Sequence, residues 1–124
     1  MKILSVDDSK VMRKIIAKAT AVLGYDVLEA ANGQAAFDLL ESSHSEIGLI
    51  LLDWNMPEMD GLTFLAKVKA DERFRHLPVM MVTSESDRTK MVQAIRAGAS
   101  NYLTKPFTQE ELEMKIASCL GESV

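Results

Sequence analysis

Five polar side chains stand at the ends of short apolar runs in this sequence. Asp7 and Asp8 follow the first run, Asp53 the third and Thr83 the fourth, and Lys105 comes just after the fifth. Three carboxylates that meet repel one another by about 4 kcal/mol per pair at 4 Å and an effective dielectric constant of 20, and one lysine cannot neutralise them. A divalent cation can, and an all-oxygen ligand set favours Mg²⁺ or Mn²⁺ over zinc. The sequence therefore predicts a magnesium site that also receives a phosphoryl group, with an aspartate as the nucleophile.

The elements that must position these side chains alternate regularly along the chain. Apolar runs typical of strands occur at residues 3–6, 27–28, 49–52, 79–82 and 101–103, and a stretch with helical spacing follows each of them. Five such units in 124 residues predict an α/β domain with one parallel sheet and helices on both faces. Because the carboxyl ends of parallel strands share one edge, the five polar side chains should converge there.

Local signals predict where several helices begin, where they end and which sides face the core. Ser9 is expected to cap the first helix and Gly24 to stop it. Thr108 and Glu111 have the spacing of a capping box at the start of the last helix. Apolar stripes that we expect to face the core include Met12, Ile15, Ile16, Ala19, Val22 and Leu23 in the first helix and Met91, Ile95 and Gly98 in the fourth.

The length, composition and charge of the chain exclude several classes of protein. The chain has 124 residues, 48% of them hydrophobic, which suits one folded domain. An apolar run such as 49–52 is far shorter than the ~20 residues that span a membrane, and the single cysteine, Cys119, indicates a reducing compartment. A formal net charge of −4 argues against a basic nucleic-acid interface. We expect a cytoplasmic protein with one domain over residues 1–124 and no output domain.

Four motifs together resemble the receiver domain of two-component response regulators, in the family's order and spacing over nearly the whole chain. They are Val6-Asp7-Asp8-Ser9, Leu52-Asp53-Trp54-Asn55-Met56-Pro57-Glu58-Met59-Asp60-Gly61, Val82-Thr83 and Lys105-Pro106-Phe107. The resemblance implies a flavodoxin-like, doubly wound fold with strand order 2-1-3-4-5. The Asp-Trp-Asn-Met-Pro run, Gly-Ala-Ser at 98–100 and Tyr102 are most similar to the chemotaxis branch of the family.

The resemblance implies distinct roles for the acidic residues. Asp53 would accept the phosphoryl group from a phosphohistidine of a partner kinase. Asp8, Asp53 and the backbone carbonyl of Asn55 would bind Mg²⁺ directly, with Mn²⁺ as an alternative ion, and Asp7 would act through a water molecule. The family also has a cis peptide bond at the position of Lys105–Pro106, which proline permits.

Residues around the acceptor have implied roles as well. Lys105 would pair with one phosphoryl oxygen, and Thr83 would donate its hydroxyl to another. Tyr102 would be the switch aromatic, which turns inward when Thr83 moves toward the phosphoryl group. Asn55 and Glu85 would flank the path of the water that hydrolyses the acyl phosphate, and would therefore tune its lifetime.

Under this resemblance the protein is a phosphoacceptor switch and not an enzyme, although it assists its own phosphorylation and autodephosphorylation. Its expected partners are a chemotaxis-type sensor histidine kinase, a flagellar motor switch protein or other downstream target, and a phosphatase. The partner surface would consist of the fourth helix, the fifth strand and the fifth helix. We expect a monomer that binds neither nucleic acid nor membrane.

Other functions share parts of this pattern. A single-domain receiver of a non-chemotaxis phosphorelay, or a phosphate sink, would have the same site. A haloacid-dehalogenase-like phosphatase also uses an aspartate nucleophile and Mg²⁺, but it needs an acid/base aspartate where this chain has Asn55. A flavodoxin-like electron carrier is disfavoured because Asp7 and Asp8 would repel the phosphate of FMN.

Overall fold

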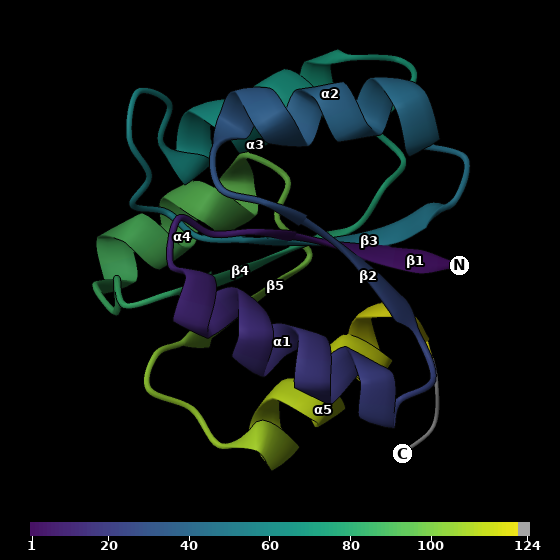
Figure 1. Ribbon diagram of the computed structural model, residues 1–124. Coiled ribbons are helices and arrows are strands. Elements are labelled where there is room, and N and C mark those ends of the chain that lie inside the picture. The colour runs from purple at the N-terminus through teal and green to yellow at the C-terminus, as the bar shows by residue number, and fades with distance from the viewer. Residues whose placement is uncertain (122–124) are drawn as a thin grey trace.

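Strands and helices alternate throughout the computed structural model, which describes residues 1–121 (Figure 1). The strands are β1 (Lys2–Val6), β2 (Asp26–Ala30), β3 (Ile47–Leu52), β4 (Val79–Thr83) and β5 (Asn101–Thr104). The helices are α1 (Lys10–Val22), α2 (Gly33–Ser43), α3 (Gly61–Ala70), α4 (Arg88–Arg96) and α5 (Gln109–Cys119). The predicted number and order of elements are confirmed. Within residues 1–121, no helix is long and apolar enough to cross a membrane.

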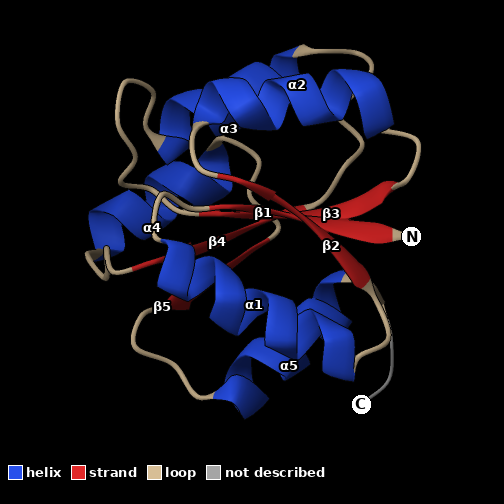
Figure 2. Ribbon diagram, in the orientation of Figure 1, coloured by secondary structure: helices blue, strands red, loops and turns tan. Residues whose placement is uncertain are grey.

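The five strands form one parallel sheet in the order β2-β1-β3-β4-β5. This is the strand order that the family resemblance implied, so the flavodoxin-like fold is confirmed. Figure 2 shows the strands between two layers of helices, with α2 and α3 on one side and α1 and α5 on the other. Because all strands run in the same direction, their carboxyl ends lie at one edge of the sheet.

Two apolar cores, one on each face of the sheet, hold the helices in place. Strand side chains point alternately to the two faces, so Ile3 packs in the core below α1 and α5, whereas Leu4 and Val6 pack in the core under α2 and α3. Every residue of β4 is buried, and β3 is buried at all positions except Gly48. Burial on both faces explains why these two strands are uninterrupted apolar runs.

Polar side chains cap the helices and fix where each begins. Each helix is preceded by a residue whose side chain accepts a hydrogen bond from a backbone N–H of the first turn: Ser9, Asn32, Asp60, Asp87 and Thr108. Thr108 and Glu111 form the predicted capping box. Gly24, with a φ of 85°, follows α1 in the left-handed conformation that favours glycine. Each cap contributes about 1 kcal/mol to stability, so the predicted helix boundaries were well specified locally.

The predicted inner face of α4 is wrong. Met91 and Ile95 are 36% and 47% exposed, and Gly98 is exposed, whereas Ala94 is the buried residue of the helix. At about 100° per residue, Met91 and Ile95 lie about 60° and 100° around the axis from Ala94. The helix is therefore turned so that its small residue meets the core and its large apolar side chains face outward. In α1, Ile15 and Val22 were also predicted to face the core, but both are exposed.

Ser5 in β1 offers a test of how this core is packed. Its hydroxyl is buried and has no hydrogen-bond partner among residues 1–121. An unsatisfied buried polar group carries a desolvation penalty, so Ser5→Ala should raise the free energy of unfolding by about 1 kcal/mol, measured by urea denaturation. As a control, Thr20→Val removes a buried hydroxyl that donates to the carbonyl of Ala17, and it should lower stability. Loss of stability in Ser5→Ala would contradict this account.

Candidate functional site

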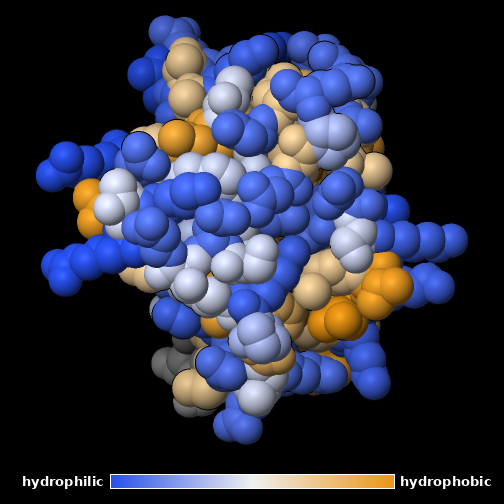
Figure 3. Space-filling model, turned by 90° about the vertical axis from the view of Figure 1, so that its left-hand side faces the viewer, coloured by the Kyte–Doolittle hydropathy of each residue, from blue (hydrophilic) through white to orange (hydrophobic). Residues whose placement is uncertain are grey.

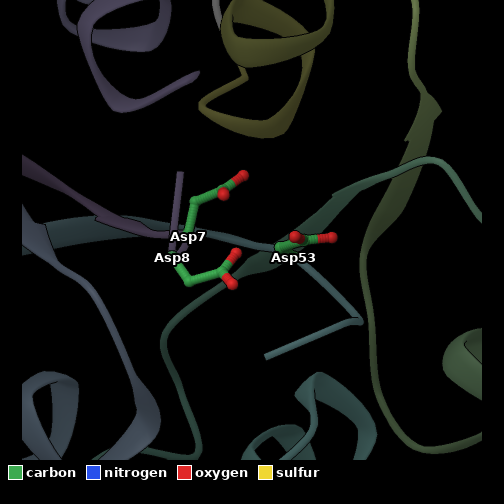
Figure 4. A group of neighbouring side chains, drawn as sticks. All are labelled: Asp7, Asp8 and Asp53. Carbon is green, nitrogen blue, oxygen red and sulfur yellow. The ribbon is translucent and has the colours of Figure 1, made fainter. Parts of the chain in front are cut away.

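Three carboxylates meet at the carboxyl-terminal edge of the sheet. Asp7 and Asp8 lie in the loop after β1, and Asp53 directly follows β3. Figure 4 shows the side chains of Asp7 and Asp8, one above and one below the strand, both extending in the direction of Asp53. One oxygen of each lies within 4.8 Å of one oxygen of the other two. The predicted convergence of these three residues is confirmed, and it follows from the parallel order of β1 and β3, which are neighbours.

Lys105, which directly follows β5, completes this group from the far side of β4. Its Nζ lies 2.8 Å from Oδ2 of Asp7 and 3.5 Å from Oδ2 of Asp53. The contact with Asp53 agrees with the expectation that Lys105 converges with the carboxylates at this edge, but the shorter contact with Asp7 was not predicted. The peptide bond before Pro106 is cis, as the family resemblance implied. The ammonium group therefore bridges the two buried carboxylates.

Burial dominates the electrostatics of Asp53. Desolvation raises the pKa of its carboxyl above the ordinary value, and the nearby Asp7 raises it further. The ammonium of Lys105 and hydrogen bonds from the Thr83 side chain and the Asn55 backbone lower the pKa, but they do not cancel the effect of burial. The ionised form of Asp53 is thus held in an environment that disfavours it, and a further cation would relieve this.

The oxygens that remain free fit a divalent cation. Both carboxylate oxygens of Asp7 are engaged, because Oδ1 accepts from the Ser9 N–H at 2.9 Å and Oδ2 accepts from Lys105. The carboxylate of Asp8 is exposed and accepts no hydrogen bond within residues 1–121. The donor set consists of oxygen atoms only, which suits Mg²⁺ or Mn²⁺. These residues therefore fit the predicted metal.

Gly61 positions the loop that carries Asp53. Its N–H donates to the carbonyl of Trp54 at 2.7 Å, and a Cβ at this position would clash with the carbonyl oxygen of Asp53. The turn between Asp53 and α3 therefore needs glycine at residue 61. Asp60 caps α3 immediately before it. The Asp-Gly pair of the motif thus has a local structural reason.

Glu85 connects the loop that follows Asp53 to α4. Its carboxylate accepts a hydrogen bond from Nδ2 of Asn55 at 2.9 Å and pairs with Nζ of Lys90 at 2.7 Å. These two partners, Lys90 first, lower the pKa of the Glu85 carboxyl. The same ammonium group lies 5.4 Å from the ring centroid of Trp54. Sequence reasoning selected Asn55 and Glu85 but missed their direct contact and the ion pair of Glu85 with Lys90, because no local spacing relates these three residues.

Thr83 and Tyr102 are buried residues of β4 and β5, the two strands beyond β3 and Asp53. Thr83 ends β4 and is fully buried, with its Oγ1 accepting from the N–H of Glu85 at 3.3 Å. Tyr102 in β5 is 8% exposed, and its hydroxyl donates to the carbonyl oxygen of Glu85. Burial, together with the charge of Glu85, raises the pKa of the Tyr102 phenol. The aromatic ring faces inward in this structure, which is the orientation that the resemblance implied for the switched state.

The rim around this site is hydrophilic. Figure 3 looks onto the edge where the strands end, and polar surface occupies its centre while apolar patches lie toward the periphery. Neither histidine contributes to the acidic cluster. Nδ1 of His44 lies 3.0 Å from the carbonyl oxygen of Leu40, and its ring packs edge-on against Phe74. Within residues 1–121, Asp7, Asp8 and Asp53 are the only acidic, histidine or cysteine side chains grouped closely enough to hold a metal ion.

The raised pKa of Asp53 predicts a specific pH dependence of stability. A carboxyl whose pKa is higher in the folded state than in the unfolded state lowers stability once the pH exceeds the unfolded value of about 3.9. Asp53→Asn should therefore be more stable than the wild type at pH 7 in buffer with EDTA, and the difference should shrink toward pH 3. Urea unfolding across this range measures it, with Asp26→Asn, at an exposed position, as the control. A difference that stays constant with pH would contradict the assignment.

Comparison with known proteins identifies the family to which this chain belongs. Residues 3–117 match the family described as the response regulator receiver domain. The chain is 44% identical over 122 residues to the chemotaxis protein CheY1 of Helicobacter pylori strain J99, and the match covers 98% of both chains. It is 43% identical over 122 residues to the chemotaxis protein CheY homolog of Campylobacter jejuni, covering 98% of this chain and 93% of the relative.

Solved structures share the same fold. Chemotaxis protein CheY4 of Vibrio cholerae matches with a TM-score of 0.88 at 31% identity, covering 96% of this chain and 98% of that one. A putative response regulator from Chloroflexus aurantiacus matches with a TM-score of 0.90 at 27% identity, covering 98% of both chains. A two-component response regulator with a GGDEF domain matches with a TM-score of 0.90 at 27% identity over 49% of its length. The chain therefore belongs to the response regulator receiver domain family and is a receiver of the CheY type.

Proposed function

We propose that this protein accepts a phosphoryl group on Asp53 from a histidine kinase, in a Mg²⁺-dependent reaction, and switches the surface formed by α4, β5 and α5 for partner binding. The observation that carries the proposal is the meeting of three carboxylates with Lys105 and Thr83 at one edge of the sheet. CheY-like receivers are signalling switches, not conventional enzymes. Here the chain would assist its own phosphorylation and autodephosphorylation.

The ion would be held by the oxygens that the protein leaves free. Asp8, Asp53 and the backbone carbonyl of Asn55 are the proposed direct ligands of Mg²⁺, and Mn²⁺ would serve as a substitute. Asp7 would act through water, which is supported by the engagement of both its carboxylate oxygens by Ser9 and Lys105. When bound, the ion supplies the positive charge that neutralises the carboxylates and the incoming phosphoryl oxygens.

Phosphoryl transfer asks this chain mainly for positioning. A carboxylate oxygen of Asp53 would form the new bond to phosphorus as the P–N bond of the phosphohistidine breaks and the imidazole leaves with the bonding electron pair. No general base is needed, because the nucleophile is already ionised. Lys105 and Thr83 would each bind a phosphoryl oxygen. Asn55 and Glu85, which bond to each other, would limit the approach of water and tune the lifetime of the acyl phosphate.

The proposed output surface has the character of a binding face. Met91 and Ile95 of α4 expose apolar side chains there. The nearby cations Arg88, Lys90 and Lys115 would complement an acidic partner segment. We propose a chemotaxis-type histidine kinase as the donor and a flagellar motor switch protein as the target, with a phosphatase as a further partner, in the cytoplasm. The chemotaxis names of the relatives at 43–44% identity support this choice.

We further propose that residues 1–124 act as one receiver domain, and as a monomer. The match to 98% of the length of a chemotaxis relative supports the single receiver domain. A receiver of a non-chemotaxis phosphorelay, or a phosphate sink, is the second candidate, because such proteins share the acceptor site. A haloacid-dehalogenase-like phosphatase is disfavoured, since the side chain at residue 55 is an amide that bonds to Glu85.

Labelling with acetyl phosphate tests the acceptor. In the presence of Mg²⁺ the wild type should form a phosphoprotein that is labile to alkali and to hydroxylamine, as an acyl phosphate is. Asp53→Asn should reduce the label to background because, among residues 1–121, no other carboxylate lies beside both Lys105 and Thr83. EDTA should abolish labelling and Mn²⁺ should restore it. Asp26→Asn serves as the control and should label like the wild type. Undiminished incorporation in Asp53→Asn would overturn the assignment, and steady hydrolysis of p-nitrophenyl phosphate would favour the phosphatase alternative.

The energetics predict an incomplete switch in the absence of a partner. Moving a two-state equilibrium from 1:99 to 99:1 takes about 5.5 kcal/mol, while a hydrogen bond to a charged group contributes roughly 1.5–3 kcal/mol. Lys105 already contacts Asp53 at rest, so its gain is partial. Relaxation-dispersion NMR on the beryllofluoride complex, which mimics the phosphorylated state, should show exchange in α4 and β5. A single rigid state without a partner would contradict this prediction.

A further inference from the structure

Arg13 of α1 reaches from its helix to the loop that carries the two adjacent aspartates. Its Nη1 donates to the backbone carbonyl oxygen of Asp7 at 2.6 Å, and its Nε donates to Oε1 of Glu29 in β2 at 3.1 Å. The arginine side chain is only 15% exposed, while that of Glu29 is 42% exposed. The guanidinium group thus has one fixed partner in the sheet and one in the loop.

Arg13 binds the carbonyl group of the peptide unit that leads from Asp7 into Asp8. The other polar groups of Asp7 are anchored as well, since its N–H donates to the carbonyl of Ala30 and its carboxylate binds Ser9 and Lys105. The carbonyl belongs to the planar peptide unit that joins Asp7 to Asp8. Holding it therefore restricts ψ of Asp7 and φ of Asp8.

Asp8 depends on this restraint more than its neighbours do. Its carboxylate is exposed and accepts no hydrogen bond from the described residues, so no side-chain contact directs it toward Asp53. Figure 4 shows it below the strand, opposite Asp7, and extending in the direction of Asp53. The orientation of the backbone is what places its oxygen within 4.8 Å of the other two carboxylates.

We propose that Arg13 is a positioning residue for the magnesium site: by holding the Asp7–Asp8 peptide against Glu29 of β2, it directs the Asp8 carboxylate toward the ion. The inference rests on the proposed Mg²⁺ site. Mg²⁺ demands near-ideal octahedral geometry, and loss of a group that orients a ligand commonly weakens metal binding by about 10- to 100-fold.

Simple electrostatics predicts the opposite effect, which makes the proposal testable. The guanidinium group carries a positive charge close to a site for a divalent cation, so its charge alone repels the ion. Removing the charge without any positioning effect would leave Mg²⁺ binding unchanged or make it tighter. Weaker binding after the loss of a nearby positive charge requires a geometric cause.

The decisive variant is Arg13→Met. Methionine has an unbranched apolar side chain and favours helix formation, but it lacks the guanidinium group and its charge. The dissociation constant for Mg²⁺, measured by titrating MgCl₂ while following the fluorescence of Trp54, should rise about tenfold. Lys14→Met is the matched control, because it removes the same charge from an exposed neighbour on α1. It should bind Mg²⁺ as tightly as the wild type or slightly more tightly.

A second variant and a second readout separate positioning from general damage. Arg13→Lys keeps the charge but cannot engage both oxygens with one planar fork, so it should also weaken Mg²⁺ binding; it becomes decisive if Arg13→Met does not fold. A purely structural role would lower the melting temperature in EDTA without changing the dissociation constant. An unchanged or lower constant in the folded variant would overturn the role of Arg13. A wild type that shows no Mg²⁺-dependent signal would instead refute the magnesium site.

Discussion

The burial of two carboxylates beside a third, at the edge where the strands end, is the constraint on which the rest of the site depends. Asp7 and Asp53 are almost fully removed from water, and charged groups in such places need compensation. Lys105 provides part of it from β5 and Arg13 fixes the backbone from α1. The remaining negative charge is what makes this edge receptive to a cation.

The loops that follow the strands are held by backbone contacts as much as by side chains. Glycine at residue 61 allows α3 to start against the carbonyl of Asp53, and the N–H of Asp7 is tied to β2. These restraints preorganise the backbone from which the carboxylates project. Such preorganisation lowers the cost of binding and of positioning a phosphoryl group.

Glu85 gives the site a physical connection to the surface that would meet partners. Its side chain binds Asn55 beside the acceptor and Lys90 on α4, and its backbone binds Thr83 and Tyr102. A displacement of Thr83 toward the acceptor would therefore disturb contacts on both α4 and β5. Several modest contacts therefore share this coupling, among them the hydrogen bond from the Tyr102 hydroxyl to the Glu85 carbonyl.

The alternation of apolar runs and amphipathic stretches was enough to predict an α/β domain with one parallel sheet, whereas the strand order came from the family resemblance. The polar residues after those runs predicted most of the site, because parallel strands bring their carboxyl ends together whatever the details of packing. Contacts between distant side chains were not encoded in local spacing. Three such contacts depend on how the helices and strands pack: Arg13 with Asp7, Lys105 with Asp7 as well as Asp53, and Lys90 with Glu85. The outward turn of Met91 and Ile95 has the same origin, since the orientation of α4 follows from the fit of Ala94 against the core and not from the apolar pattern of the helix.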